Sequence, residues 1–137
     1  MTLFVRRLPA LLLLALLAAC RSFSVSPMQF ERVSRDYNAM LRWQESAMAA
    51  TTFVDKGARS AYEAKVAASA GVKIADYRVI SWECDPDKGE ARVKVEFDYY
   101  VPPSTRLKTV TDEQKWVYRE EPGQEGWRLT TLLPDFK

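Results

Sequence analysis

Residues 91–101 have the sequence ARVKVEFDYYV, in which apolar and polar side chains alternate. Successive side chains of a β-strand point to opposite faces, so this alternation predicts a strand with one buried face and one face in water. The predicted buried face consists of Ala91, Val93, Val95, Phe97, Tyr99 and Val101, and the solvent face of Arg92, Lys94, Glu96, Asp98 and Tyr100. A sheet that contains this strand needs a second layer over one face only.

Three further strands are predicted around this segment. A long strand is expected at residues 72–84, and the turn sequence DPDKG at 85–89 separates it from the central strand. After the prolines at 102 and 103, residues 107–120 predict a third strand. The sequence EPGQEG at 121–126 predicts a turn, and residues 127–133 a fourth strand. The four strands form an antiparallel meander.

The chain before these strands has helical periodicity. Ser26 and Pro27 are typical of a helix start, because serine can cap free amides and proline at the first position loses no hydrogen bond. Apolar residues then recur at helical spacing as far as Trp43, and shorter helices are predicted at 46–54 and 59–69. The predicted fold class is α+β, with N-terminal helices packed on a curved, cone-like, four-stranded antiparallel sheet.

This order of helices and strands, with a late Trp-Arg-Leu strand that begins at Trp127, resembles the nuclear transport factor two-like fold. A cystatin-like sheet wrapped on one helix is the nearest rival. The resemblance covers most of residues 27–133 and rests on element order. It implies no single function, because that fold hosts isomerases, dehydratases, binding modules and scaffolds.

The first twenty residues resemble the leader of a bacterial lipoprotein. Arg6 and Arg7 precede an apolar run at 11–17, and the leader ends in the lipobox-like sequence LAAC at 17–20. The resemblance implies that residues 1–19 are removed as a signal peptide and that Cys20 receives a diacylglyceryl group. The alternatives are an ordinary signal peptide, or a transmembrane anchor, with an incidental cysteine. The run is shorter than the ~20 apolar residues of a membrane span, which favours the lipoprotein.

Processing at Cys20 leaves a tether at 20–26 and a single domain at 27–137. The tether reaches at most ~25 Å when extended, so the domain is expected close to its membrane. Arg21 and Ser22 follow the cysteine where an aspartate would favour inner-membrane retention, which resembles the outer-membrane class. We therefore expect a periplasm-facing, lipid-anchored protein of the cell envelope, with the outer membrane favoured over the inner one.

Charge and composition exclude several classes of function. Two of the 20 basic residues, Arg6 and Arg7, lie in the leader, so 18 basic residues then face 18 acidic ones. No basic excess favours nucleic acid as a partner. The chain has no histidine, which excludes histidine-based acid–base catalysis and the commonest zinc ligand sets. The carboxylates are dispersed, so neither a metal site nor a cofactor is predicted.

The aromatic side chains of the strands are the candidates for a ligand pocket. An apolar ligand inside the cone would contact Tyr77, Tyr99, Trp116, Tyr118 and Trp127, and Trp82 could also line the mouth of the cone. The alternative is that most of them fill the core of a curved sheet. The lone Cys84 is expected to be a small buried residue.

Catalytic carboxylates are the second kind of candidate. Asp98 lies beside Tyr99 in the sequence, but the alternation predicts that they face opposite sides, which leaves Asp76 and Glu83 as possible inward acids. The basic residues Arg92, Lys94, Arg106, Lys108, Lys115 and Arg119 could form a positive patch. Pairing with Glu96, Asp98, Asp112 and Glu113 across a solvated face is the simpler interpretation.

These features predict a non-catalytic, membrane-anchored domain that binds another envelope component. The alternative is a carrier of a small apolar ligand, and a more distant alternative is an isomerase- or dehydratase-like enzyme.

Overall fold

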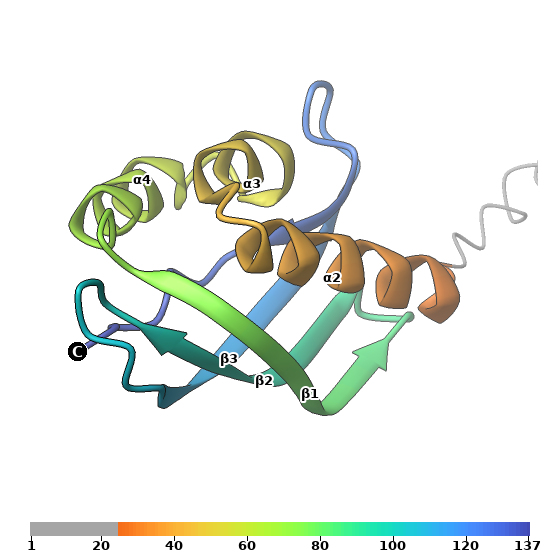
Figure 1. Cartoon of the computed structure of the whole chain (residues 1–137). Helices are drawn as coiled ribbons and strands as arrows, with labels where there is room; N and C mark the ends of the chain where they lie inside the picture. The colour runs from red at the N-terminus through yellow and green to blue at the C-terminus, as the bar shows by residue number, and fades with distance from the viewer. Residues whose placement is uncertain (1–24) are drawn as a thin grey trace, which may run out of the picture.

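The computed structural model describes residues 25–137 and has three helices packed against a four-strand antiparallel sheet (Figure 1). The helices are α2 (Pro27–Arg42), α3 (Ser46–Phe53) and α4 (Arg59–Ala68). The strands are β1 (Lys73–Asp85), β2 (Glu90–Tyr100), β3 (Lys108–Arg119) and β4 (Gly126–Leu129). The predicted α+β class is therefore confirmed. The predicted signal peptide and Cys20 lie outside the described residues.

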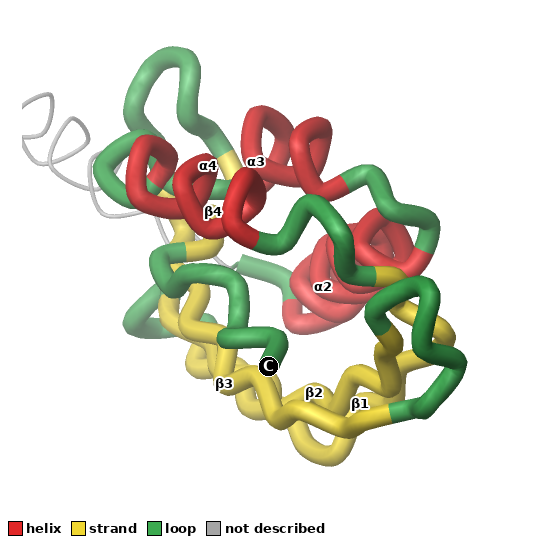
Figure 2. The backbone as a smooth tube through the Cα atoms, turned by 60° about the vertical axis from the view of Figure 1, so that its left-hand side comes forward, coloured by secondary structure: helices red, strands yellow, loops and turns green. Residues whose placement is uncertain are grey.

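All three helices lie on one side of the sheet (Figure 2). The strand order is β1-β2-β3-β4, with antiparallel neighbours throughout. The β1–β2 turn forms because the Asp85 carboxylate accepts hydrogen bonds from the backbone N–H groups of Asp87 and Lys88. Gly89 closes that turn with a φ of 63°, a conformation that glycine adopts at little cost.

The inner face of the sheet carries the core. Val93, Val95, Phe97 and Tyr99 of β2 are each at most 3% exposed, as the alternation predicts. Trp116 of β3 packs against Phe30, Tyr37 and Phe53 of the helices, with ring centroids 5.4–6.4 Å apart in edge-on geometry. In the part of the chain that the structure describes, no helix is long and apolar enough to cross a membrane.

The fourth strand is shorter than predicted. It ends at Leu129, whereas the sequence predicts a strand to residue 133. Beyond Leu129, the N–H and hydroxyl of Thr130 both bond to the Lys115 carbonyl, and the Thr131 hydroxyl accepts the Lys115 N–H. Threonine side chains thus replace the regular backbone ladder and end the strand.

The two ends of helix α2 are determined by backbone groups and backbone conformation, without a side-chain cap. The Ser26 hydroxyl makes no capping hydrogen bond, contrary to prediction, and the Ser26 carbonyl accepts instead from Gln29 and Phe30. At the other end Gln44 adopts a left-handed φ of 64°. This conformation costs a non-glycine residue about 1–2 kcal/mol, so other contacts of Gln44 must compensate.

Candidate functional site

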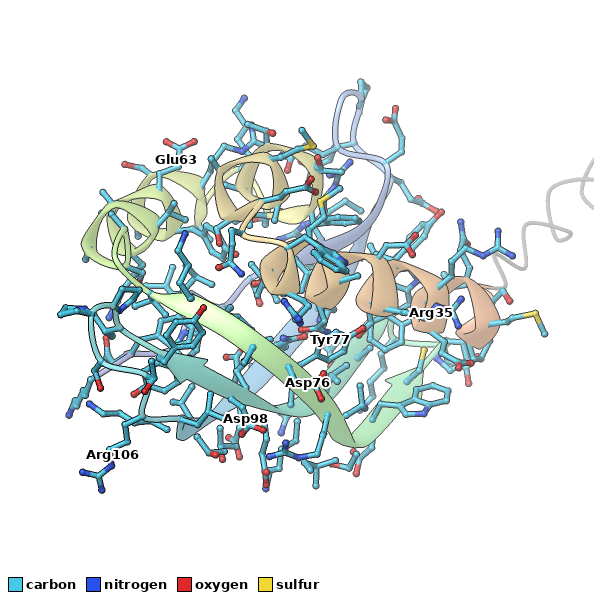
Figure 3. All side chains as sticks on the ribbon, in the orientation of Figure 1. Arg35, Glu63, Asp76, Tyr77, Asp98 and Arg106 are labelled. Carbon is cyan, nitrogen blue, oxygen red and sulfur yellow. The ribbon has the colours of Figure 1, made fainter. Side chains whose placement is uncertain are left out.

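A groove of about 380 Å³ runs between helix α2 and strand β1. Its lining residues are Phe30, Glu31, Ser34 and Arg35 of α2, Tyr77, Val79 and Trp82 of β1, and Val93 of β2. Figure 3 shows Arg35 on α2 and Tyr77 on β1 beneath that helix. Volume and apolar lining are in the range of sites that bind small molecules or side chains of a partner.

The groove exists because β1 is covered less completely than β2. Val79 and Trp82 lie on the helix-facing side, opposite the buried Val95 and Val93 of β2. They are nevertheless 47% and 44% exposed. Only Phe30 reaches down from α2, with its ring centroid 6.2 Å from that of Trp82. The inner face of the sheet therefore stays open at the β1 edge.

Three polar side chains of α2 form the helix wall of the groove. Glu31 and Arg35 are four residues apart and lie on one face of the helix, and Ser34 between them is 6% exposed. The groove thus combines an apolar floor with one acidic and one basic side chain. Such a surface can bind an apolar group and fix its orientation by charge.

A second set of polar residues is buried between the helices and β3. The hydroxyls of Tyr37 and Tyr62 lie 2.8 Å apart. The Gln114 side-chain amide donates to Asn38 Oδ1 at 2.8 Å and to Asp112 Oδ2 at 3.0 Å. Each of these five side chains is at most 5% exposed. The cluster joins α2 and α4 to β3.

Burial shifts the titration of this cluster. Removal from water raises the pKa of Asp112 to about 6, although the hydrogen bond from Gln114 acts in the opposite direction. Burial also raises the pKa of Tyr37 and of Tyr62. A carboxyl group beside two hydroxyls has the chemistry of an acid–base site. However, Tyr37 and Tyr62 are 0% exposed, so a substrate cannot reach them without rearrangement.

The charge pattern predicts Asp112 on the solvated face of the sheet, and that prediction is wrong. Asp112 pairs with Val95 across the sheet and shares the inner face with Gln114 and Trp116. The signal was available in the sequence, because residues 112, 114 and 116 share one face of a strand and Trp116 was expected to face inward.

The other candidate carboxylates lie at the surface. Asp98 is on the outer face, where Arg78 Nη1 donates to it at 2.6 Å, while Tyr99 is 3% exposed on the inner face (Figure 3). The hydrogen bond from Arg78 lowers the pKa of Asp98. Asp76 and Glu83 are both exposed. None of the three stands beside a tyrosine hydroxyl inside the groove.

The five predicted pocket residues are distributed over three places. Tyr77 alone lines the groove. Trp116 is in the core, where Trp127 packs against Phe30 and against Tyr118 at centroid distances of 4.9 and 5.6 Å. Tyr99 lies toward the C-terminal residues, where its hydroxyl donates to the Lys137 carbonyl at 2.7 Å. Most of these aromatic rings therefore act as core. Trp82, the further aromatic candidate, also lines the groove, whereas Phe30, Val79 and Val93 are groove residues that the pocket prediction omits.

Opposite charges pair across the outer face of the sheet. Lys94 lies 3.6 Å from Glu113, and Arg78 lies 2.8 Å from Glu96. Arg119 instead pairs with Asp55, at 3.1 Å, at the end of α3. Cys84 is half-buried, which raises the pKa of its thiol. Within residues 25–137, no three acidic or cysteine side chains gather in a way that could hold a metal ion.

Comparison with known proteins supports the fold. No family model matches the chain, and no curated protein matches it by sequence. A similar solved structure is that of the intermembrane space region of the chloroplast protein ARC6. It covers 78% of this chain and 94% of its own, with a TM-score of 0.52 and 14% sequence identity. At this identity the likeness shows the α+β fold alone.

Proposed function

We propose that the protein is a lipid-anchored domain of the bacterial cell envelope that binds another envelope component and catalyses no reaction. The groove between α2 and β1 carries the proposal, because Val79 and Trp82 remain about half exposed in a fold that otherwise buries its inner face. Exposed apolar residues grouped in one place mark binding sites more often than single ones do. The lipobox-like sequence at 17–20 supplies the anchor.

Two observations support a binding role over catalysis. Asp76 and Glu83 are exposed to water, where nothing shields a general base, and the Asp98 carboxylate is paired with Arg78 on the outer face. The one carboxyl group within the described residues with a pKa near neutrality, Asp112, is 5% exposed behind the helices.

The neighbour of similar fold is the intermembrane space region of a chloroplast protein, which agrees with an envelope setting.

Chemical crosslinking in intact cells tests the proposal. The wild type is compared with two matched variants, Val79→Asp in the groove and Met48→Asp on α3. Each variant adds one carboxylate at a half-exposed apolar position. A discrete adduct is expected for the wild type and for Met48→Asp, and its loss for Val79→Asp. An adduct that persists in Val79→Asp, or no adduct in any of the three, would contradict a binding role for the groove.

The groove also favours a second candidate, a carrier of a small apolar ligand. Its volume of about 380 Å³ is sufficient for such a ligand, and Arg35 at the wall could pair with an anionic group. Native mass spectrometry of the purified full chain distinguishes the two functions. A co-purifying small molecule that is lost in Val79→Asp would favour the carrier, and a protein mass without added ligand would favour the protein-binding domain.

A further inference from the structure

Near the start of strand β1, side chains cover the free edge at Ile74. Ile74 donates its N–H to Gln44 Oε1 at 3.3 Å, and its carbonyl accepts from Gln44 Nε2 at 3.2 Å and from Arg42 Nη1 at 3.1 Å. Gln44 therefore binds Ile74 in the way that a neighbouring strand would. This contact also explains why Gln44 tolerates its left-handed φ of 64°.

The second half of β1 has no such cover. The last register irregularity lies between Val79 and Ser81, and from there to Asp85 every residue pairs regularly with β2. Among residues 25–137, no helix or loop makes a hydrogen bond with the backbone of residues 81–85 outside the β1–β2 ladder. The outer edge of this segment thus presents free backbone groups over five regular residues, a common strand length.

The side chains of residues 81–85 divide into an apolar and an acidic face. Trp82 and Cys84 pair with the buried Val93 and Ala91 and so lie on the side of the groove. Glu83 and Asp85 lie on the opposite side and are exposed. Within the described residues neither of these two carboxylates makes an ion pair, and the Asp85 carboxylate accepts the backbone N–H groups of Asp87 and Lys88 in the β1–β2 turn.

We infer that residues 81–85 of β1 accept an extended segment of the envelope partner as an additional antiparallel or parallel strand, in which apolar and basic residues alternate. The inference rests on the proposed function and specifies the partner's chemistry. Backbone hydrogen bonds supply affinity in this binding mode, and pockets for alternate side chains supply specificity. The apolar residues of the segment lie beside Trp82 and the groove, and the basic residues lie opposite Glu83 and Asp85, because opposite charges stabilise cross-strand pairs.

A second copy of this chain is a poorer occupant. Pairing of two β1 edges would bring Glu83 and Asp85 of one copy beside the same acidic residues of the other. Like charges across adjacent strands destabilise the pair. The acidic side chains at this edge therefore disfavour self-association and favour a basic partner.

Binding of a synthetic eight-residue peptide that alternates valine and lysine tests the inference on the full chain. Hydrogen exchange is expected to show increased protection of backbone amides confined to residues 81–85. Glu83→Lys is expected to weaken binding roughly five- to tenfold, since it replaces an attractive pair by a repulsive one. Glu63→Lys on α4 makes the same charge change at an exposed position and is expected to leave binding unchanged (Figure 3).

Two further controls separate strand addition from other modes. Trp82→Ala is expected to weaken the peptide about tenfold, and Trp43→Ala, which removes a tryptophan that is 68% exposed, to have no effect. Two further peptides are N-methylated at alternate residues, one at the odd and one at the even positions, so that each lacks the N–H groups along one edge. One of the two is expected to lose binding.

Several results would overturn the inference. They are full binding by both methylated peptides, equal binding by Glu83→Lys and Glu63→Lys, absence of protection at residues 81–85, or concentration-dependent self-association through β1. The proposed function would survive each of them if crosslinking still required Val79. If the wild type forms no adduct that depends on Val79 but still binds the peptide, the result would count against the proposed function alone.

Discussion

At the scale of single residues, Asp112 shows why a buried carboxyl group is hard to find from sequence. It lies on a strand between Thr111 and Glu113, which both face water, and only its parity with Trp116 indicates burial. Its hydrogen-bond partner Gln114 also donates to Asn38, which lies more than seventy residues away in the sequence. Sequence patterns describe the faces of one element well, but they do not show which polar groups meet between elements.

The raised pKa of Asp112 predicts a pH-dependent stability. Its pKa is about 6 in the folded protein against 3.8 in the unfolded chain, so the folded state holds the proton more tightly. The contribution of Asp112 to stability is therefore fully present below about pH 4 and is lost as the pH rises through about 6. Two pKa units correspond to about 3 kcal/mol. Asp112→Asn is expected to remove this dependence and to increase the free energy of unfolding at pH 7.

Urea denaturation between pH 4 and pH 8 measures this effect. Asp98→Asn is the matched control, because the pKa of Asp98 is lowered by Arg78 and its contribution has the opposite sign. That contribution is full above about pH 4, so Asp98→Asn is expected to keep the pH dependence of the wild type over the measured range. Equal pH profiles for the wild type and Asp112→Asn would contradict the raised pKa of Asp112. They would show that its carboxyl group ionises as readily in the folded protein as in the unfolded chain.

Gln44 permits a second test at this scale. Its side chain makes two hydrogen bonds to Ile74, and its backbone has a φ of 64°. Gln44→Ala keeps the strained backbone and loses the bonds, so it is expected to cost about 1–3 kcal/mol of unfolding free energy. Gln44→Gly loses the same bonds but relieves about 1 kcal/mol of strain, so it is expected to be the milder change. Equal midpoints in urea for the two variants would contradict the strain.

At the scale of elements, the sequence predicts each helix and strand but not how completely each is covered. The alternation in β2 identifies the buried face correctly from Ala91 to Tyr99. In α2 the buried face also contains Ser34 and Asn38, which a search for apolar periodicity omits. These polar residues are tolerated because Gln114 of β3 satisfies Asn38, and that pairing depends on tertiary contacts.

Two tryptophans on the same face of the sheet distinguish core from site. Trp116 is 1% exposed among three aromatic rings, so Trp116→Ala is expected to cost about 3–5 kcal/mol. Trp82 is 44% exposed, so Trp82→Ala is expected to cost about 1 kcal/mol, because much of the ring already contacts water. Chemical denaturation measures both. A loss at Trp82 as large as that at Trp116 would show that Trp82 holds the fold together instead of being available for binding.

At the scale of the whole molecule, the α+β class follows from the change of period between the helices and the strands. The groove does not follow from it. Its width depends on how far α2 lies from β1 and on the two irregularities of β1, which no local pattern specifies. The five aromatic residues predicted to share one pocket illustrate this, since only Tyr77 lines the groove.

The proposed membrane anchor also belongs to the scale of the whole molecule. Cys20→Ser removes the sulfur that would accept the diacylglyceryl group, so labelling with a palmitate analogue is expected to disappear and the protein to leave the membrane fraction. Several acyl chains on one cysteine hold a protein firmly, whereas one chain gives only marginal binding. Equal labelling of the wild type and Cys20→Ser, or no labelling of either, would contradict the lipoprotein interpretation.

Photo-crosslinking in living cells tests the binding groove most directly. A photoreactive amino acid replaces Trp82 at the groove in one strain and Trp43 at the end of α2 in another, so that both probes are exposed aromatic positions of one protein. The groove hypothesis predicts a discrete adduct with one envelope protein from position 82 and none from position 43. Adducts of equal yield from both positions, or none from position 82, would contradict it.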